Sequence, residues 1–195
     1  MWKIPEEIIR GQLTAGEQLL WSGEPQQGVF LRGCDAFLIP FSLMWGGFAI
    51  FWEFSAVTTN APIEFKIWGI PFVLVGLYMI IGRFWADARL RANTAYGVTS
   101  ERIIIISGLF YKQTKSLSLD TLTDVSLTEK SGAVGTITFG QVPFWQSMYG
   151  NMPWPGLGPQ SVPQFELIPE ARSVYETIRS AQKAAKLQNV VASNN

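Results

Sequence analysis

The sequence contains no histidine and only one cysteine, Cys34, among its 195 residues. Without histidine the chain can build neither a Ser-His-Asp nor a Cys-His catalytic centre, and it has no imidazole for a metal site or a pH switch. A single cysteine excludes an intrachain disulfide and any zinc or iron–sulfur site built from several cysteines. We therefore expect no catalytic residues, no cofactor and no metal ion.

Charge is scarce as well. Charged residues make up 15% of the chain, against about 25% in typical soluble domains. The 15 basic and 15 acidic residues cancel to a formal net charge of +0, so we expect no nucleic-acid partner. Hydrophobic residues instead reach 48% and aromatic residues 13%. This balance favours a protein that contacts a membrane.

Two apolar segments, 36–52 and 67–82, carry no charge. With their flanks, each approaches the length of about 20 residues that a membrane-spanning helix needs. Tryptophans lie near the segment ends, as in an interfacial aromatic belt. The alternative is a pair of buried core helices. The sequence predicts a transmembrane hairpin over 36–86, with these tryptophans at its borders: Trp45, Trp52, Trp68 and Trp85.

Basic residues predict the orientation of this hairpin. Lys66 is the only one between the two spans, and the other fourteen precede or follow the hairpin. The positive-inside rule then places both termini in the cytoplasm. Arg83, Arg89 and Arg91 follow the second span, where they set topology and are candidate contacts to anionic lipid, each worth about 1 kcal/mol. Neither span contains an ionisable pair, so we interpret the hairpin as an anchor.

The remaining sequence predicts a mixed α and β domain. A helix is expected over 5–13, with Ile4, Ile8 and Ile9 on one face, and a short strand within 17–25. After the hairpin come further strands and then one amphipathic helix from Pro169, followed by a disordered tail after residue 187. The later strands are expected at 95–99, 102–107, 115–119, 125–129, 135–140 and 165–168, and the apolar stripe of the helix is Ala171, Val174, Tyr175, Ile178 and Ala181.

A few side chains are candidates for chemistry. Asp120 and Asp124 could pair as carboxylates, but a turn with a cap explains their spacing better. Cys34 is expected to be a structural or lipid-facing thiol, with S-acylation as the alternative. A basic rim on the domain is a further possibility, built from Arg102, Lys112 and Lys115.

Several segments in order carry a family resemblance. They are Leu-Trp-Ser-Gly-Glu-Pro at 20–25, Tyr-Gly-Val-Thr-Ser-Glu-Arg-Ile-Ile-Ile at 96–105, Ser-Leu-Ser-Leu-Asp at 116–120, Gly-Thr-Ile-Thr-Phe-Gly at 135–140 and the helix over 171–181. Together the chain resembles the bacterial pleckstrin-homology-like (PH-like) membrane proteins. The resemblance implies a cytoplasmic split β-barrel, capped by a C-terminal amphipathic helix, with the transmembrane hairpin inserted after the first strand. It brings no catalytic residues.

This resemblance sets the expected organisation of the chain. Residues 1–35 would supply the N-terminal helix and first strand, 36–86 the hairpin, 94–186 the rest of the PH-like domain and 187–195 the tail. The protein would lie in the bacterial inner membrane. Residues 24–28 lack the basic cluster with which eukaryotic PH domains hold phosphoinositides, so we expect no inositol-phosphate site.

The segment 141–164 is uncharged and rich in proline and aromatic residues. Loops of this length are uncommon in compact domains unless they are functional or disordered. We hypothesise that it lies against the bilayer interface or packs on a partner protein; the alternative is that it covers the domain's own open edge. The candidate interface residues are Phe144, Trp145, Met148, Tyr149, Met152 and Trp154.

Together these features predict a non-catalytic, membrane-anchored PH-like module with a scaffold or assembly role. It would bind a partner protein, a second copy of itself or a lipid surface at the cytoplasmic face. One alternative is an accessory subunit of a larger membrane complex, with Gly46 and Gly47 as the helix contact. A lipid-processing enzyme is a further alternative.

Overall fold

A computed structural model of the protein describes residues 4–31, 35–109, 111–129, 133–141 and 162–193. The chain forms two compact units. The first comprises 1–27, 89–143 and 159–195, and the second comprises 28–88 and 144–158. Each is described by itself.

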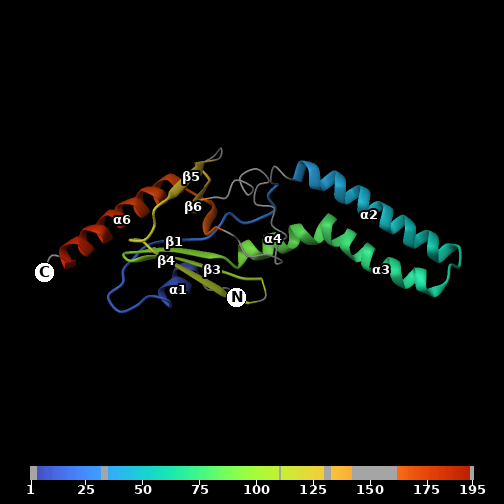
Figure 1. Cartoon of the computed structure of the whole chain (residues 1–195), viewed down its shortest axis with the longest axis horizontal. Helices are drawn as coiled ribbons and strands as arrows, with labels where there is room; N and C mark the ends of the chain where they lie inside the picture. The colour runs from blue at the N-terminus through green and yellow to red at the C-terminus, as the bar shows by residue number, and fades with distance from the viewer. Residues whose placement is uncertain (1–3, 32–34, 110, 130–132, 142–161, 194–195) are drawn as a thin grey trace. The chain divides into compact units, whose positions relative to one another are not determined.

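The first unit contains two antiparallel sheets (Figure 1). The predicted strands are present, and in the described residues they form two separate sheets and not a closed barrel. The side chains of both sheets and of the C-terminal helix share one core. Their apolar surface is therefore buried although the two sheets are separate. The first sheet has the order β1 (Leu19–Gly23), β2 (Ala95–Thr99), β3 (Arg102–Ser107), β4 (Gln113–Ser118), and the second has β5 (Val125–Glu129), β6 (Gly135–Phe139), β7 (Gln164–Ile168).

The strand that precedes the hairpin pairs with the strand that follows it. Gly23 of β1 lies opposite Tyr96 of β2, and Trp21 lies opposite Val98. A lone strand is not stable in water, because its hydrogen-bonding groups need a partner. The hairpin is therefore inserted between two neighbouring strands of one sheet, as the resemblance implied.

The isoleucine run of β3 is buried on both faces. Ile103 and Ile105 belong to the main core between the sheets, whereas Ile104 and Ile106 lie in a second cluster with Ile9. Successive strand residues point to opposite faces, so an unbroken apolar run requires cover on both sides. The short helix α1 (Pro5–Arg10) supplies that cover.

Helix α1 is shorter than predicted. It ends at Arg10, and Ile4 is 65% exposed while Ile9 is fully buried. Ile9 packs so closely on β2 that a Cβ added to Gly97 would lie 2.6 Å from its Cγ2 atom. Glycine at position 97 therefore lets the helix approach the sheet.

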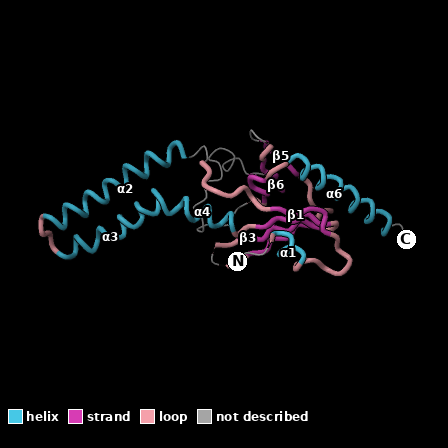
Figure 2. Tube along the Cα trace, turned by 180° about the vertical axis from the view of Figure 1, so that it is seen from behind, coloured by secondary structure: helices cyan, strands magenta, loops and turns pink. Residues whose placement is uncertain are grey.

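Aromatic rings fill the main core beneath helix α6 (Ala171–Ser193). The ring of Phe165 stacks on Tyr96 at a centroid distance of 4.5 Å and meets the edge of Phe139 at 5.0 Å. Figure 2 shows α6 running beside β5 and β6. Val174 and Ile178 of its predicted apolar stripe are buried in this core. The helix continues to Ser193, through residues for which we predicted a disordered tail, because 188–193 contain no glycine or proline to end it.

The second unit is a pair of apolar helices. α2 (Asp35–Thr58) packs side by side with α3 (Ile63–Leu77), as both Figure 1 and Figure 2 show. α3 continues through a π-helical turn, η1 (Tyr78–Gly82), into α4 (Arg83–Ala92). The two helical stretches, Asp35–Thr58 and Ile63–Ala92, are long and apolar enough to cross a membrane.

Candidate membrane-contact site

The α2–α3 hairpin presents large apolar side chains outward. Only 17% of the residues in each apolar window are buried within the structure. Trp68 is 69% exposed, Phe51 68% and Trp85 65%. Contiguous apolar surface of this kind on a helix pair marks an interaction with a membrane or another protein. The hairpin therefore has the surface that a bilayer would cover.

Small residues bring the two helices into close contact. A Cβ added to Gly76 of α3 would lie 2.8 Å from the Cα of Gly46 in α2. Ser42 and Ala49 share the buried face of α2 with Gly46, so the backbones approach as they do in membrane helix pairs. Gly47 has no atom near its open side among the described residues. The two glycines of the predicted contact surface therefore differ, because Gly46 contacts α3 within the hairpin and Gly47 faces open space.

An ion pair joins the two ends of this hairpin. Nη1 of Arg83 lies 2.8 Å from Oδ1 of Asp35, with the side chains 14% and 9% exposed. The Arg83 guanidinium also lies 4.4 Å from the ring centroid of Phe84. Its Nε and Nη2 atoms are buried, and they have no hydrogen-bond partner within the described ranges. The role of Asp35 was not predicted, although opposite charges at the two ends of an apolar hairpin are a readable signal.

The three arginines proposed to contact lipid lie in different surroundings. Arg83 is in the ion pair with Asp35, and Arg89 is exposed on α4. Arg91 is only 3% exposed, and its backbone carbonyl accepts a hydrogen bond from Nε2 of Gln27 at 3.4 Å. Of the three, Arg89 is the one with a freely accessible side chain. Lipid contact by these residues stays a prediction.

The predicted interface loop lies mostly outside the described residues. This holds for all six of its candidate contact residues, and Cys34 also lies outside. At the loop's first residue, Nε2 of Gln141 donates a hydrogen bond to Oδ2 of Asp124 at 3.2 Å. Asp120 lies in the turn after β4, whereas Asp124 directly precedes β5. The candidate residues outside the described ranges are Phe144, Trp145, Met148, Tyr149, Met152 and Trp154.

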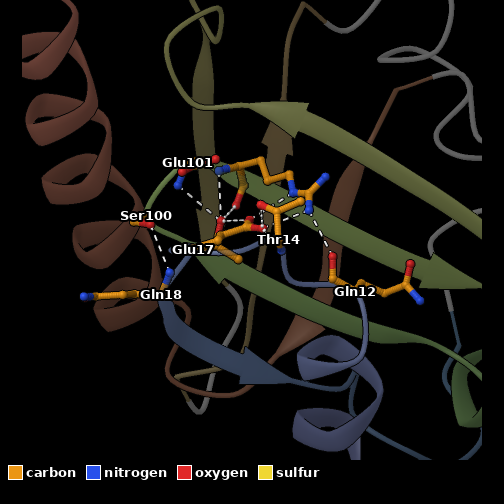
Figure 3. A network of polar contacts seen from close by, with 8 residues as sticks. Gln12, Thr14, Glu17, Gln18, Ser100 and Glu101 are labelled. Carbon is orange, nitrogen blue, oxygen red and sulfur yellow. Dashed lines mark hydrogen bonds and ion pairs between the residues drawn. The ribbon is translucent and has the colours of Figure 1, made fainter.

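A polar network holds the β2–β3 turn against the loop before β1 (Figure 3). Arg102 donates from Nε to Oε1 of Glu17 at 2.9 Å and from Nη2 to Oε2 at 2.8 Å. The hydroxyl of Thr99 donates to Oε1 at 2.6 Å and accepts from the backbone N–H of Arg102 at 3.0 Å. The hydroxyl and backbone N–H of Thr14 both donate to Oε2 at 2.9 Å. Both carboxylate oxygens of Glu17 therefore accept hydrogen bonds.

The network changes the ionisation of both charged partners. Burial by itself would raise the pKa of Glu17, but the hydrogen bonds from Arg102, Thr14 and Thr99 outweigh it and lower that pKa to about 2. The hydrogen bonds to Glu17 raise the pKa of Arg102 further. Arg102 was a candidate for a basic rim, and its charge is instead matched within the domain. The Thr-x-x-Arg segment at 99–102 thus fixes a turn, and Glu17 is its unforeseen partner.

Comparisons with known proteins agree with this architecture. A family profile described as "Bacterial PH domain" matches residues 46–189, more than half of the chain. The chain is also 28% identical over 193 residues to an "Uncharacterized 23.7 kDa protein in puhA 5'region" of Rhodobacter capsulatus, a match covering 92% of this chain and 86% of that protein. No solved structure matches the chain.

Proposed function

The chain belongs to the bacterial PH domain family, and from that premise we propose that it is a membrane-anchored binding module of the inner membrane. Membership supports a non-catalytic PH-like role. We propose that the hairpin anchors the protein and that the sheet-containing unit binds a partner protein or a lipid surface at the cytoplasmic face. Its role would be that of a scaffold or assembly factor.

The observation that carries the anchor is the outward-facing apolar surface of the hairpin. Full burial of one large apolar side chain stabilises by about 1.5–3 kcal/mol. Helix α2 alone carries several more than half exposed, among them Phe37, Phe48 and Phe54. Bilayer insertion would remove this surface from water at both helices. The anchor is therefore the part of the proposal with the largest free-energy gain.

A membrane extraction experiment tests the anchor. We expect the full chain to remain with bacterial membranes through washes with high salt and alkaline carbonate, and to be released only by detergent. A peripheral protein held by charge would leave the membrane in the salt wash. Release of this chain by either wash would contradict the anchor.

Cysteine labelling tests the orientation. In a Cys34→Ser background, Asn60→Cys places a thiol in the loop that connects α2 to α3, and Ser126→Cys places one on β5. We expect a membrane-impermeant maleimide to label position 60 in intact cells and position 126 only after lysis. The reverse pattern would place the termini on the opposite side of the membrane.

Purification in mild detergent tests the binding role. We expect a stoichiometric protein partner, or a second copy of the chain, to be retained and then identified by mass spectrometry. Trp145→Ala combined with Trp154→Ala should abolish retention without releasing the chain from the membrane. Unchanged retention by this double variant would exclude the 141–164 loop as the binding segment.

A further inference from the structure

We infer that the loop end of the hairpin binds the headgroup of one aminophospholipid, of the phosphatidylethanolamine class. Glu53 of α2 would receive the lipid ammonium, and Lys66 of α3 would receive the phosphate. One acyl chain would lie in an aromatic groove beside them. The inference rests on the proposed insertion of the hairpin into the bilayer.

Glu53 is a carboxylate placed between two apolar helices. Its Oε2 atom is buried and has no hydrogen-bond partner among the residues that the structure describes. The carboxylate lies against Gly69 of α3, where a Cβ would collide with Oε2. Glycine at position 69 thus makes room for an acidic side chain. An ionisable group in such a position is costly unless it finds a partner, so it indicates a binding role.

An aromatic groove begins at the same glycine. It has a volume of about 230 Å³ and an almost wholly apolar lining. The rings of Trp45 and Phe72 come from facing helices, with centroids 6.3 Å apart, and Trp68 meets Phe72 at 6.0 Å. An open groove with this aromatic lining suits a single flexible hydrocarbon chain, which we take as its occupant. The lining side chains are Trp45, Phe48, Ala49, Trp52, Trp68 and Phe72, with Gly69 at the carboxylate.

Lys66 supplies the complementary charge. It lies three residues before Gly69, which puts both on the same face of α3. Within the described part of the chain, neither Lys66 nor Glu53 takes part in an ion pair. A carboxylate and an ammonium on facing helices match the ammonium and phosphate of a zwitterionic lipid.

The depth of Glu53 also suits a headgroup. It precedes the end of α2 at Thr58 by five residues, which at 1.5 Å per residue is about 8 Å along the helix. This places the carboxylate near the membrane–water boundary. Trp52 and Trp68 lie at the same end, as interfacial tryptophans do.

Native mass spectrometry of the detergent-solubilised full chain tests the inference. The probes are phosphatidylethanolamine, phosphatidylcholine and phosphatidylglycerol with identical acyl chains. The choline headgroup has no N–H to donate, and the glycerol headgroup has no ammonium. We expect the ethanolamine lipid to bind about tenfold more tightly than the choline lipid, as one charged hydrogen bond would give.

Variants separate the two charges. Glu53→Gln should reduce the ethanolamine-over-choline preference to about unity, and Lys66→Gln should weaken both lipids alike and keep the preference. Glu64→Gln is the matched control, because Glu64 is an exposed acidic residue at the same end of α3. Circular dichroism shows whether each variant keeps its helices. If Glu53→Gln misfolds, the ethanolamine-over-choline preference of the wild type and the effect of Lys66→Gln still test the inference.

Three results would overturn the inference. They are equal binding of the three lipids by the wild type, an unchanged preference in Glu53→Gln, and a protein subunit that occupies the groove in place of lipid. Failure of the underlying anchor is recognised separately, because the chain would then leave the membrane in the carbonate wash. A chain that stays in the membrane and binds lipids without preference would refute only the headgroup site.

Discussion

Replacement of Glu17 by glutamine tests the polar network at the β2–β3 turn. The substitution keeps the size of the side chain and removes the negative charge to which Arg102 and two threonines donate hydrogen bonds. Removal of one partner from a buried ion pair costs about 3–5 kcal/mol. The side chain of Arg102 is 28% exposed, whereas that of Glu17 is fully buried, so water can solvate part of the guanidinium. We therefore expect a loss of about 2–3 kcal/mol in the free energy of unfolding.

The cost should depend on pH in a defined window. The pKa of Glu17 is about 2 in the folded chain, against an ordinary value of 4.5. A lowered carboxyl pKa stabilises the fold above the unfolded value and loses that contribution as the pH falls toward the folded value. The difference between wild type and Glu17→Gln should therefore be complete above pH 4.5 and shrink between pH 4.5 and about 2.

The difference in the free energy of unfolding can be measured in detergent, by following hydrogen exchange of the β2 and β3 amides as denaturant is added. Glu129→Gln is the control, because the Glu129–Arg172 pair is long, at 3.4 Å, and its side chains are 42% and 73% exposed. Exposed pairs contribute about 0–1 kcal/mol. The reasoning is refuted if Glu17→Gln costs no more than this control, or if its cost at pH 3 equals its cost at pH 7.

Three further substitutions follow from close contacts. Gly76→Ile should separate α2 from α3 and lower the thermal stability of the hairpin in detergent. Gly47 faces open space, so Gly47→Ile should leave that stability unchanged, and equal effects of the two substitutions would contradict the helix crossing. Gly97→Val should displace α1 and cost about 1–3 kcal/mol by overpacking, seen as faster exchange in residues 5–10, and normal exchange there would argue against the contact. Arg83→Gln should cost more stability than Arg83→Gln combined with Asp35→Asn, because the single change leaves a buried carboxylate without its cation; a double variant less stable than the single one would disprove the coupling.

Much of the fold could be predicted because its signals are local. The alternation within 115–119 and the turn residues around 135–140 depend on adjacent positions, and β4 and β6 lie within two residues of the predictions. The isoleucine run of β3 predicted a buried strand, although nothing adjacent in sequence indicated that α1 covers its second face. Whether two sheets close into a barrel depends on long-range packing, and here the shared core made closure unnecessary.

The polar contacts were harder to predict than the strands. Glu17 and Arg102 are 85 positions apart, and no periodicity relates them. Glu53 and Gly69 face each other because the helices are antiparallel, and that pairing depends on their register. The seven-residue spacing of Gly69 and Gly76, repeated in Gly46 and Glu53, could have shown this face of the hairpin. Gly46 and Gly47 were predicted to form a helix contact, but this spacing was not recognised.

The pairing of β1 with β2 has a consequence for the order of folding. β1 ends at Gly23 and β2 begins at Ala95, so β1 leaves the ribosome well before its partner exists. The cost of closing such a long loop falls once α2 and α3 have paired, because Asp35 and Arg83 are then in contact and only 24–34 and 84–94 remain to be bridged. Completion of the first sheet would thus wait for assembly of the hairpin. A chain whose hairpin failed to assemble would keep an unpaired β1, and quality-control proteases would have an exposed strand to recognise.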